Sequence, residues 1–184
     1  MSNNLRILGI SGSLRKNSYN TGLLRAAQAV LPADVTLDIF DLNGIPFYNG
    51  DEDQGDGKYP ERVQSLRNAI ADAHALLLAT PEYNYSYTAV LKNALDWASR
   101  GKSPLNNKPL AMLGTGGMSG TMRAQFHLRQ VLVHNDVLVM AKPELYIPGA
   151  WDKFDAEGNL TDGKVREQVR GLVEALVAWT QRVS

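Results

Sequence analysis

Short apolar runs alternate along the chain with segments in which apolar residues recur at helical spacing. A short apolar run is typical of a strand, and the helical spacing is typical of a helix that buries one face. The predicted strands are residues 5–10, 35–40, 75–79, 110–113 and 137–140. The predicted helices are residues 21–30, 60–73, 89–100, 121–133 and a C-terminal segment with an apolar stripe over 165–177. Strands and helices that alternate in this way form right-handed β-α-β units, so we expect a mostly parallel sheet.

Five strands and five helices fit an α/β, flavodoxin-like three-layer sandwich. Its five-stranded parallel sheet has the order 2-1-3-4-5, with helices on both faces. The run 75–79 is apolar throughout, as expected of a central strand covered on both sides. No segment resembles an interdomain linker, so residues 1–184 are predicted to form one domain. The acidic stretch 49–58 is predicted to be a solvated loop, with a lid or a partner contact as the alternative.

Composition and charge exclude several classes of protein. The chain has 19 Lys and Arg against 19 Asp and Glu, so its net charge of zero provides no field for nucleic acid or an anionic membrane. The lack of cysteine excludes disulfide scaffolds, iron–sulfur clusters and cysteine nucleophiles, and the 3 histidines predict no metal site. Neither a secretion signal nor an apolar segment of membrane-spanning length is found, which favours a cytoplasmic protein.

Candidate binding loops follow from the predicted strand order. Ligands of an open parallel sheet bind beyond the carboxyl ends of its strands, where the order reverses. In the order 2-1-3-4-5 this point lies between the first and third strands. It selects the loops at residues 11–20, 80–88 and 114–121.

The loop at residues 11–20 has the composition of a phosphate site. It places hydroxyls, amides and two cations between a buried strand and a helix N-terminus. Backbone N–H groups and the helix dipole attract an anion there, and Arg15 supplies a fork of donors. The alternative is a polar turn in which Ser18 or Asn20 only caps the helix. Because neither a Walker A motif nor G-x-G-x-x-G is present here, a monophosphate is favoured over triphosphates and dinucleotides.

The loop at residues 80–88 holds three tyrosines, a glutamate and an amide. Aromatic faces and planar amides suit a flat heteroaromatic ring whose edge is bound by backbone groups. The alternative is a tyrosine-rich entry to a helix that packs locally or against another subunit.

The loop at residues 114–121 is rich in glycine. Glycine lets the backbone approach a ligand closely, so its N–H groups could donate to a ring carbonyl. The glycine spacing only partly matches a dinucleotide motif, and a flexible turn is the alternative.

Two of these loops carry a family resemblance. Segments 12–20 (GSLRKNSYN) and 80–86 (TPEYNYS), followed by 91–97 (LKNALDW), resemble the NAD(P)H-dependent FMN reductases. Among these the chain is most similar to the bacterial quinone and chromate reductases. Segments 126–130 and 142–144 extend the likeness over nearly the whole chain.

The resemblance implies a flavodoxin-like fold with bound FMN and with NADH or NADPH as co-substrate. The residues implied in cofactor binding are Ser13, Arg15, Ser18, Tyr19, Asn20, Pro81, Glu82, Tyr83, Asn84, Tyr85, Gly116 and Gly117. Of these, Ser13, Arg15, Ser18 and Asn20 would hold the phosphate. Gly116 and Gly117 stand where the family usually has a hydroxyl-rich loop, which leaves only backbone donors to the ring. Homodimers or homotetramers are implied too, with Tyr85, Arg123 and Glu144 as contacts between subunits.

The expected activity is an FMN-dependent NAD(P)H oxidoreductase with ping-pong kinetics. A hydride from the nicotinamide would reach flavin N5, and quinones, chromate, azo compounds or free flavin would take the electrons, so no catalytic side chain is predicted. A flavodoxin-type electron carrier without nicotinamide activity is the alternative. Such carriers are usually strongly acidic, and the balanced charge counts against that class. An enzyme with a dinucleotide site at 114–121 is a third possibility.

For three further residues we expect structural roles. His74 is expected to make a local hydrogen bond, and Trp97 to pack its helix against the sheet. Trp151 lies in an isolated loop, where it could shield a pocket or contact another subunit.

Overall fold

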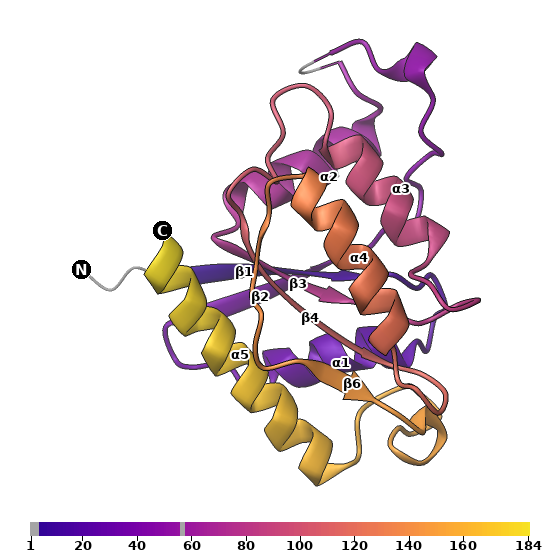
Figure 1. Cartoon of the computed structure of the whole chain (residues 1–184), viewed down its shortest axis with the longest axis vertical. Coiled ribbons are helices and arrows are strands. Elements are labelled where there is room, and N and C mark those ends of the chain that lie inside the picture. Colours follow the sequence, from indigo (N-terminus) through magenta and orange to yellow (C-terminus); the bar gives the residue numbers. More distant parts are fainter. Residues whose placement is uncertain (1–3, 56–57) are drawn as a thin grey trace.

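A parallel β-sheet runs through the centre of the computed structural model, which describes residues 4–55 and 58–184 (Figure 1). Its strands are β1 (Leu5–Ser11), β2 (Val35–Phe40), β3 (Ala75–Ala79), β4 (Pro109–Thr115), β5 (Leu138–Val139) and β6 (Leu145–Ile147). The order β2-β1-β3-β4-β5 confirms the predicted flavodoxin-like topology. The order reverses between β1 and β3, which pair in parallel from Ile7 opposite Ala75 to Ser11 opposite Ala79.

The fifth position of the sheet differs from the prediction. β5 spans only two residues and pairs with the start of β4, while β6 pairs with the end of β4, at Leu113 to Thr115. The predicted strand 137–140 was therefore too long, and the strand at 145–147 was missed. Pro143, which has no N–H to donate, lies in the interval between the two short strands.

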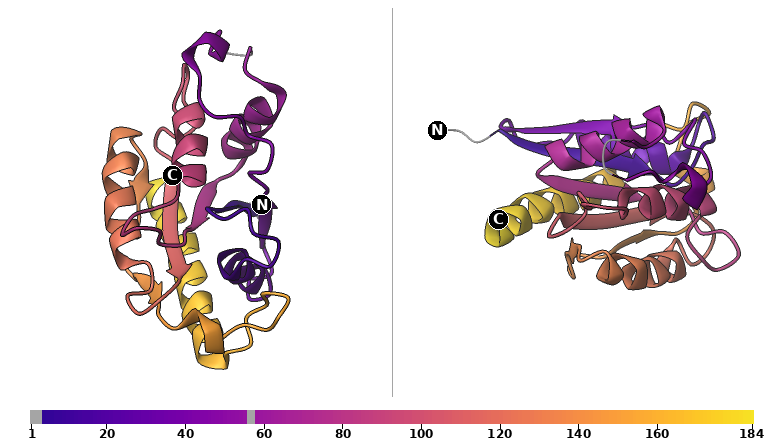
Figure 2. Two further views of the ribbon diagram at one scale, coloured as in Figure 1. Left: turned by 90° about the vertical axis from the view of Figure 1, so that its right-hand side faces the viewer. Right: turned by 90° about the horizontal axis from the view of Figure 1, so that it is seen from above.

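In the described part of the chain, five α-helices cover the two faces of the sheet (Figures 1 and 2). They are α1 (Tyr19–Gln28), α2 (Glu61–Asp72), α3 (Ala89–Ala98), α4 (Met122–His134) and α5 (Gly163–Val183), with 3-10 turns at Gly50–Glu52 and Ala150–Asp152. Ser18, Thr88 and Asp162 cap α1, α3 and α5, each accepting a backbone N–H three residues further on. All five predicted helices are confirmed, with ends that differ by a few residues.

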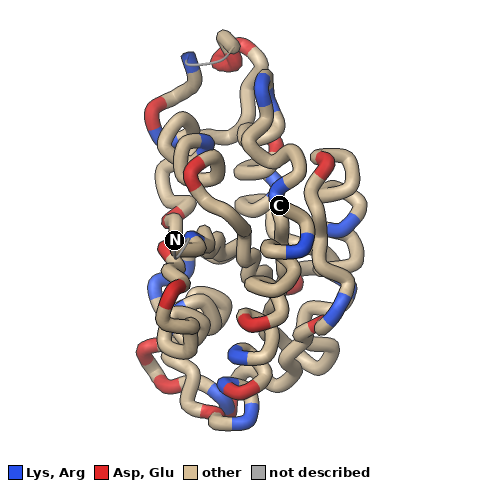
Figure 3. Tube along the Cα trace, turned by 90° about the vertical axis from the view of Figure 1, so that its left-hand side faces the viewer, with Lys and Arg blue, Asp and Glu red and all other residues tan. Residues whose placement is uncertain are grey.

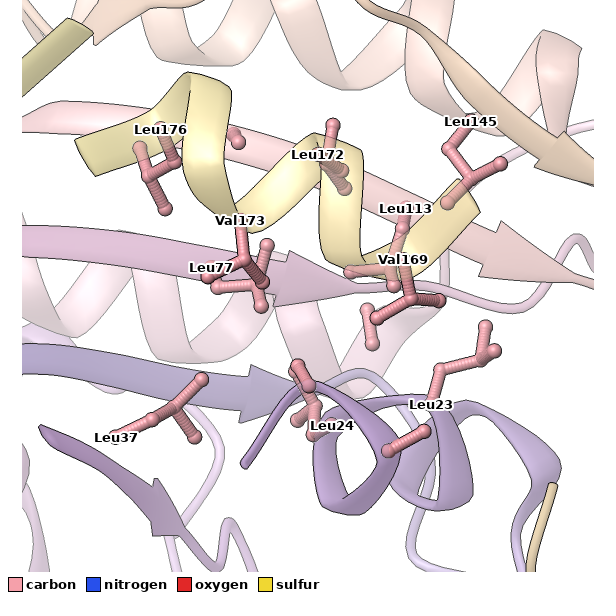
Figure 4. Packing of buried hydrophobic residues seen from close by; sticks show 14 of the residues in the cluster. Leu23, Leu24, Leu37, Leu77, Leu113, Leu145, Val169, Leu172, Val173 and Leu176 are labelled. Atoms are coloured by element: carbon pink, nitrogen blue, oxygen red, sulfur yellow. The ribbon is translucent and has the colours of Figure 1, made fainter. Parts of the chain in front are cut away.

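Two large clusters of buried hydrophobic residues lie one on each face of the sheet. α1 and α5 contribute to one cluster, which Figure 4 shows around Leu24, Leu77 and Val173. α2, α3 and α4 contribute to the other, which includes Leu76 and Leu78. Side chains of β3 thus alternate between two buried faces, which explains why the whole run is apolar.

Trp97 corrects an expectation about packing. Its buried side chain lies with Tyr59 and Val63 in a small separate cluster, and its Nε1 donates to the Pro46 carbonyl at 2.9 Å. It therefore anchors the 41–60 segment to α3, and the prediction that it packs against the sheet was wrong. Within that segment, residues 56 and 57 of the predicted 49–58 loop lie outside the described part of the chain.

Candidate functional site

The structure brings the three selected loops together at the carboxyl edge of the sheet. The Gly12 N–H donates to Ala79 O at 2.8 Å, and Thr88 Oγ1 donates to Gly12 O at 2.7 Å, which joins the first loop to the second. Asn20 joins the first loop to the third through Thr115. Ser119 Oγ donates to Glu82 Oε1 at 3.2 Å, which joins the third loop to the second.

Residues 13–18 lead into α1 through a turn in which the Ser18 N–H donates to Arg15 O at 3.1 Å. Ser13 Oγ accepts the Arg15 N–H at 3.3 Å, and buried Ser18 caps α1 by accepting the Thr21 N–H at 3.4 Å. Arg15 Nη2 donates to Asn17 O at 2.6 Å, and the guanidinium carbon lies 4.6 Å from the centre of the Tyr19 ring. Beside this turn is a pocket of about 370 Å³, lined by Ser11, Ser13, Leu14, Arg15, Lys16, Thr21, Ile39, Phe40, Asp41, Leu42 and Asn43.

Asn20 has a structural task that the sequence did not reveal. Its side chain is buried, with Nδ2 donating to Thr115 O at 3.0 Å and Oδ1 accepting the Thr115 N–H at 3.0 Å. Both ends of the amide are thus used to hold α1 against the end of β4. The helix cap that the sequence assigned to either Ser18 or Asn20 is made by Ser18.

Within the loop at residues 80–88, residues 83–86 form a tight hairpin turn. The N–H groups and carbonyls of Tyr83 and Ser86 bond each other at 2.9 and 3.0 Å, around Asn84 and Tyr85 with φ of 49° and 67°. Positive φ at both central residues is the type I′ pattern, which costs energy for a bulky side chain such as that of Tyr85. Tyr83 and Tyr85 are exposed at the tip, whereas Pro81 is buried.

Glu82 binds across to the start of α4. Its side chain is 6% exposed, and its carboxylate pairs with Arg123. Oε2 accepts the backbone N–H groups of Arg123 at 3.0 Å and Ala124 at 3.2 Å. Burial raises the pKa of Glu82, but the hydrogen bonds from Arg123 and Ala124 and the charge of Arg123 outweigh it, so the pKa is lowered overall. No sequence signal linked these residues, since 41 positions separate Glu82 from Arg123.

The glycine loop is shaped by close packing on one side and is open on the other. A Cβ at Gly114 would lie 2.3 Å from Thr80 O, so only glycine fits there without a shift. The Gly116 N–H donates to Ile147 O at 3.3 Å and is therefore already engaged. The exposed Gly117 N–H has no hydrogen-bond partner within residues 4–55 and 58–184, and a Cβ there would meet open space.

A pocket of about 410 Å³ separates the hairpin from the glycine loop. Its lining residues are Glu82, Asn84, Tyr85, Gly117, Met118, Ser119, Gly120 and Arg123. Tyr85 lies over Arg123, with the guanidinium carbon 3.6 Å from the ring centre. The pocket thus combines an aromatic face, a half-exposed cation and a backbone donor.

The predicted subunit contacts have partners within the chain. Arg123 bonds Glu82, whereas Glu144 pairs with Lys142 at 2.6 Å and Arg129 at 3.9 Å. Burial, and then the nearby Glu144 carboxylate, raise the pKa of Tyr146 to about 12. Elsewhere, His74 Nδ1 accepts the Arg6 N–H at 3.0 Å, as expected.

Two further searches covered the described residues alone. They contain no group of three or more His, Asp and Glu side chains placed to hold a metal ion. None of their helices combines the length and apolarity needed to cross a bilayer.

Comparison with known proteins identifies the family. Residues 5–152 match the family model for NADPH-dependent FMN reductases. The chain belongs to this family. The resemblance carried by its first two loops is thereby confirmed.

Relatives match along nearly their full length. An NAD(P)H-dependent FMN reductase of Pseudomonas aeruginosa is 48% identical over 100% of this chain and 99% of its own. An NADPH:quinone oxidoreductase of Arabidopsis thaliana is 42% identical over 97% of this chain and 93% of its own. The structure is similar to that of FerB, a flavoenzyme NAD(P)H:(acceptor) oxidoreductase from Paracoccus denitrificans, with a TM-score of 0.86 and 34% identity over 97% and 98% of the two chains.

Proposed function

We propose that the chain is a single-domain, FMN-dependent NAD(P)H:quinone oxidoreductase. The observation that carries this proposal is the meeting of three loops at the switch point of the sheet, with a helix N-terminus at one end and an aromatic pocket at the other. This is where an open α/β sheet binds its ligand. Relatives named as FMN and quinone reductases over nearly the whole chain support the same function.

The residues at the start of α1 fit a phosphate. Ser13, Arg15 and Ser18 surround the helix N-terminus, where backbone N–H groups and the helix dipole favour an anion. Asn20 would contribute indirectly, by holding α1 against β4. Tyr19 stacks on Phe154 with ring centres 4.7 Å apart and would close the far side of the turn.

The hairpin and the glycine loop fit the edge of a flat ring. Pro81 to Tyr85 would border it, and the free Gly117 N–H would donate to a ring carbonyl. With Gly116 already bonded to Ile147, Gly117 is the better donor of the pair. Bound FMN would supply the redox chemistry, and the protein would orient it and tune its surroundings.

Quinones are the proposed acceptors, and chromate, azo compounds and free flavin would be further ones. Either NADH or NADPH would serve as donor. The interspersed charges on the trace in Figure 3, like the net charge of zero, favour an enzyme for small molecules over an acidic electron carrier. Cytoplasmic location stays a prediction.

Self-association is proposed through α4. Met122, Phe126 and Val133 are all exposed, Phe126 by 51% and Val133 by 75%, and their spacing places them along one side of the helix. An exposed apolar stripe of this kind is typical of a contact between subunits. Tyr85 is exposed close by, at the pocket that Arg123 also lines, and could extend the contact.

Two measurements test the proposed function. The purified protein should contain about one FMN per chain and show flavin absorption. It should oxidise NAD(P)H with quinone in ping-pong fashion. Colourless protein that takes up no added FMN would contradict the proposal. FMN-containing protein that is inert toward both NADH and NADPH would instead indicate an electron carrier, and NAD(P)H binding without FMN would indicate a dinucleotide site.

A further inference from the structure

A second pocket, of about 430 Å³, is formed by α1, α5 and the loop before α5. The two helices cover the same face of the sheet (Figure 1). Three arginines line the pocket, Arg25 from α1 and Arg166 and Arg170 from α5, and the other described residues that line it are uncharged. The lining residues are distinct from those proposed to bind FMN. The pocket is therefore a separate, strongly basic feature of the molecule.

Arg25 is held by the loop before α5. Its Nε donates to Asn159 Oδ1 at 3.1 Å, and its Nη2 donates to Gly158 O at 2.9 Å and to Glu157 O at 3.4 Å. Asn159 is held in turn by Asp155, which accepts its backbone N–H at 2.7 Å and its Nδ2 at 3.1 Å. No hydrogen bond within the described part of the chain engages Arg25 Nη1. The guanidinium is thus oriented in advance, so it loses little freedom when it binds a ligand.

Arg166 and Arg170 lie one turn apart on α5, and both are exposed. Arg166 Nη2 donates to Leu160 O at 3.0 Å, and Arg170 Nε donates to Glu167 Oε2 at 3.1 Å. Among residues 4–55 and 58–184, no hydrogen bond engages Nη1 of Arg166 or either terminal nitrogen of Arg170. Each arginine therefore keeps donors for a ligand.

The position of these cations on α5 is electrostatically unfavourable. Asp162 caps the helix, but its first turn has no acidic residue and carries Lys164 and Arg166. The positive end of the helix dipole repels cations there, and Arg166 also repels Arg170 at a spacing of four residues. An anion bound between the arginines would replace both repulsions by attractions.

The lining of the pocket favours a compact ligand with several negative charges. No acid is found among the described residues that line it, although Asp155 and Glu167 lie beside its arginines. The buried side chains of Ala26, Val30 and Leu160 form an apolar wall. A concave site of this kind suits a small molecule, and the net charge of zero gives no long-range attraction for a nucleic acid.

We propose that this pocket binds a diphosphate group, either free or attached to a nucleoside. Guanidinium groups bind phosphate oxygens through pairs of parallel N–H bonds, and a diphosphate offers enough oxygens for all three arginines. Where a nucleoside is attached, it packs against the apolar wall. The inference does not depend on the proposed redox function, so the two can fail separately.

The test measures pyrophosphate binding to the FMN-saturated protein by calorimetry at constant ionic strength. Arg170→Gln should weaken binding ~10-fold or more, because a hydrogen bond to a charged group is lost. Arg170→Lys keeps the charge but loses the fork of donors, so its affinity should fall between. Arg182→Gln is the matched control, since it removes the same charge from the exposed far end of α5, and it should change the affinity under ~2-fold.

A measurement without ligand separates binding from folding. The pair between Arg170 and Glu167 is exposed, and Arg170 is repelled by Arg166. Arg170→Gln should therefore leave the Tm of the ligand-free, FMN-saturated protein unchanged or slightly raised. Added pyrophosphate should raise the Tm of the wild-type protein and of Arg182→Gln more than that of Arg170→Gln.

ADP distinguishes the two sources of the diphosphate. Tighter binding of ADP than of pyrophosphate, with both weakened in Arg170→Gln, would assign the site to a nucleoside diphosphate. Equal or weaker binding of ADP would assign it to free diphosphate.

Three results would overturn the inference. The first is that the wild-type protein binds neither ligand. The second is an affinity that Arg170→Gln leaves unchanged or lowers no more than Arg182→Gln does, which would indicate a general effect of charge. The third is binding that is lost in Arg15→Ala but retained in Arg170→Gln, which would place the ligand at the start of α1.

Discussion

The loops at residues 11–20 and 80–88 follow two adjacent central strands, yet they differ in how they use their polar groups. In the first, Ser18 and Asn20 are buried and bonded to the protein itself. In the second, Tyr83 and Tyr85 are exposed, and the tip has positive φ at two residues other than glycine. One end of the site is thus built into the fold, and the other end faces solvent.

This difference suits two kinds of ligand. A cofactor phosphate always has the same shape and charge, so an anion site fixed by a helix cap and a buried amide is adequate for it. Acceptors vary in size, and an exposed aromatic hairpin beside an open glycine loop can receive several of them. We therefore expect mutations in the first loop to affect folding and cofactor binding, and those in the hairpin to affect acceptors.

Asn20→Ala should have the largest effect on stability. It leaves both the N–H and the carbonyl of buried Thr115 without partners, which should lower the free energy of unfolding by about 3 kcal/mol. Urea denaturation of the FMN-free protein measures this. Asn68→Ala is the control, because Asn68 is exposed on α2 and should cost under about 0.5 kcal/mol. If both variants lost the same free energy of unfolding, the buried hydrogen bonds of Asn20 would not stabilise the fold.

Arg15→Ala should weaken FMN binding by about 1.5–3 kcal/mol, the range for a hydrogen bond to a charged group. Unfolding of the FMN-free protein should change little, because the Arg15 side chain bonds the neighbouring Asn17 carbonyl and stacks on Tyr19, both close to it in the chain. Fluorescence titration with FMN gives the affinity. An unchanged affinity would remove Arg15 from the phosphate site.

Glu82→Gln should lower the free energy of unfolding by about 1 kcal/mol at neutral pH, since the group that accepts from Arg123 and Ala124 loses its negative charge. The pKa of Glu82 is lowered in the folded protein, so its contribution is complete above the ordinary carboxyl value of 4.5 and is lost as pH falls through the folded value. The gap between wild type and variant should therefore close in acid. A gap that widens below pH 4.5 would contradict this assignment.

Tyr85→Asn should have the smallest effect on stability, under about 1 kcal/mol. Asparagine tolerates the positive φ better, and this gain offsets the lost contact with Arg123. Acceptor KM should change more than FMN affinity. If FMN affinity falls instead, the hairpin belongs to the fixed end of the site and the contrast between the two loops fails.

The sequence predicted strands and helices correctly where a single local pattern of apolar residues was sufficient. The apolar run of β3 and the stripe of α5 indicated burial directly, and the alternation of elements gave the strand order. The sequence failed to predict contacts between residues far apart in the chain, and it missed a very short strand. Trp97 binds the Pro46 carbonyl, and the edge strand β6 is too short to show a pattern.

The same division holds at the site. Local composition alone pointed to a hydroxyl-rich anion loop, a tyrosine hairpin and a glycine turn at three strand ends, because the carboxyl edge of a parallel sheet gathers such loops. Only the tertiary structure decided that Asn20 holds Thr115, that the Gly116 N–H is engaged while that of Gly117 is free, and that Glu82 orients Arg123. Hydrogen bonds between residues far apart in sequence depend on the packing of whole elements, and neither propensity nor spacing contains that information.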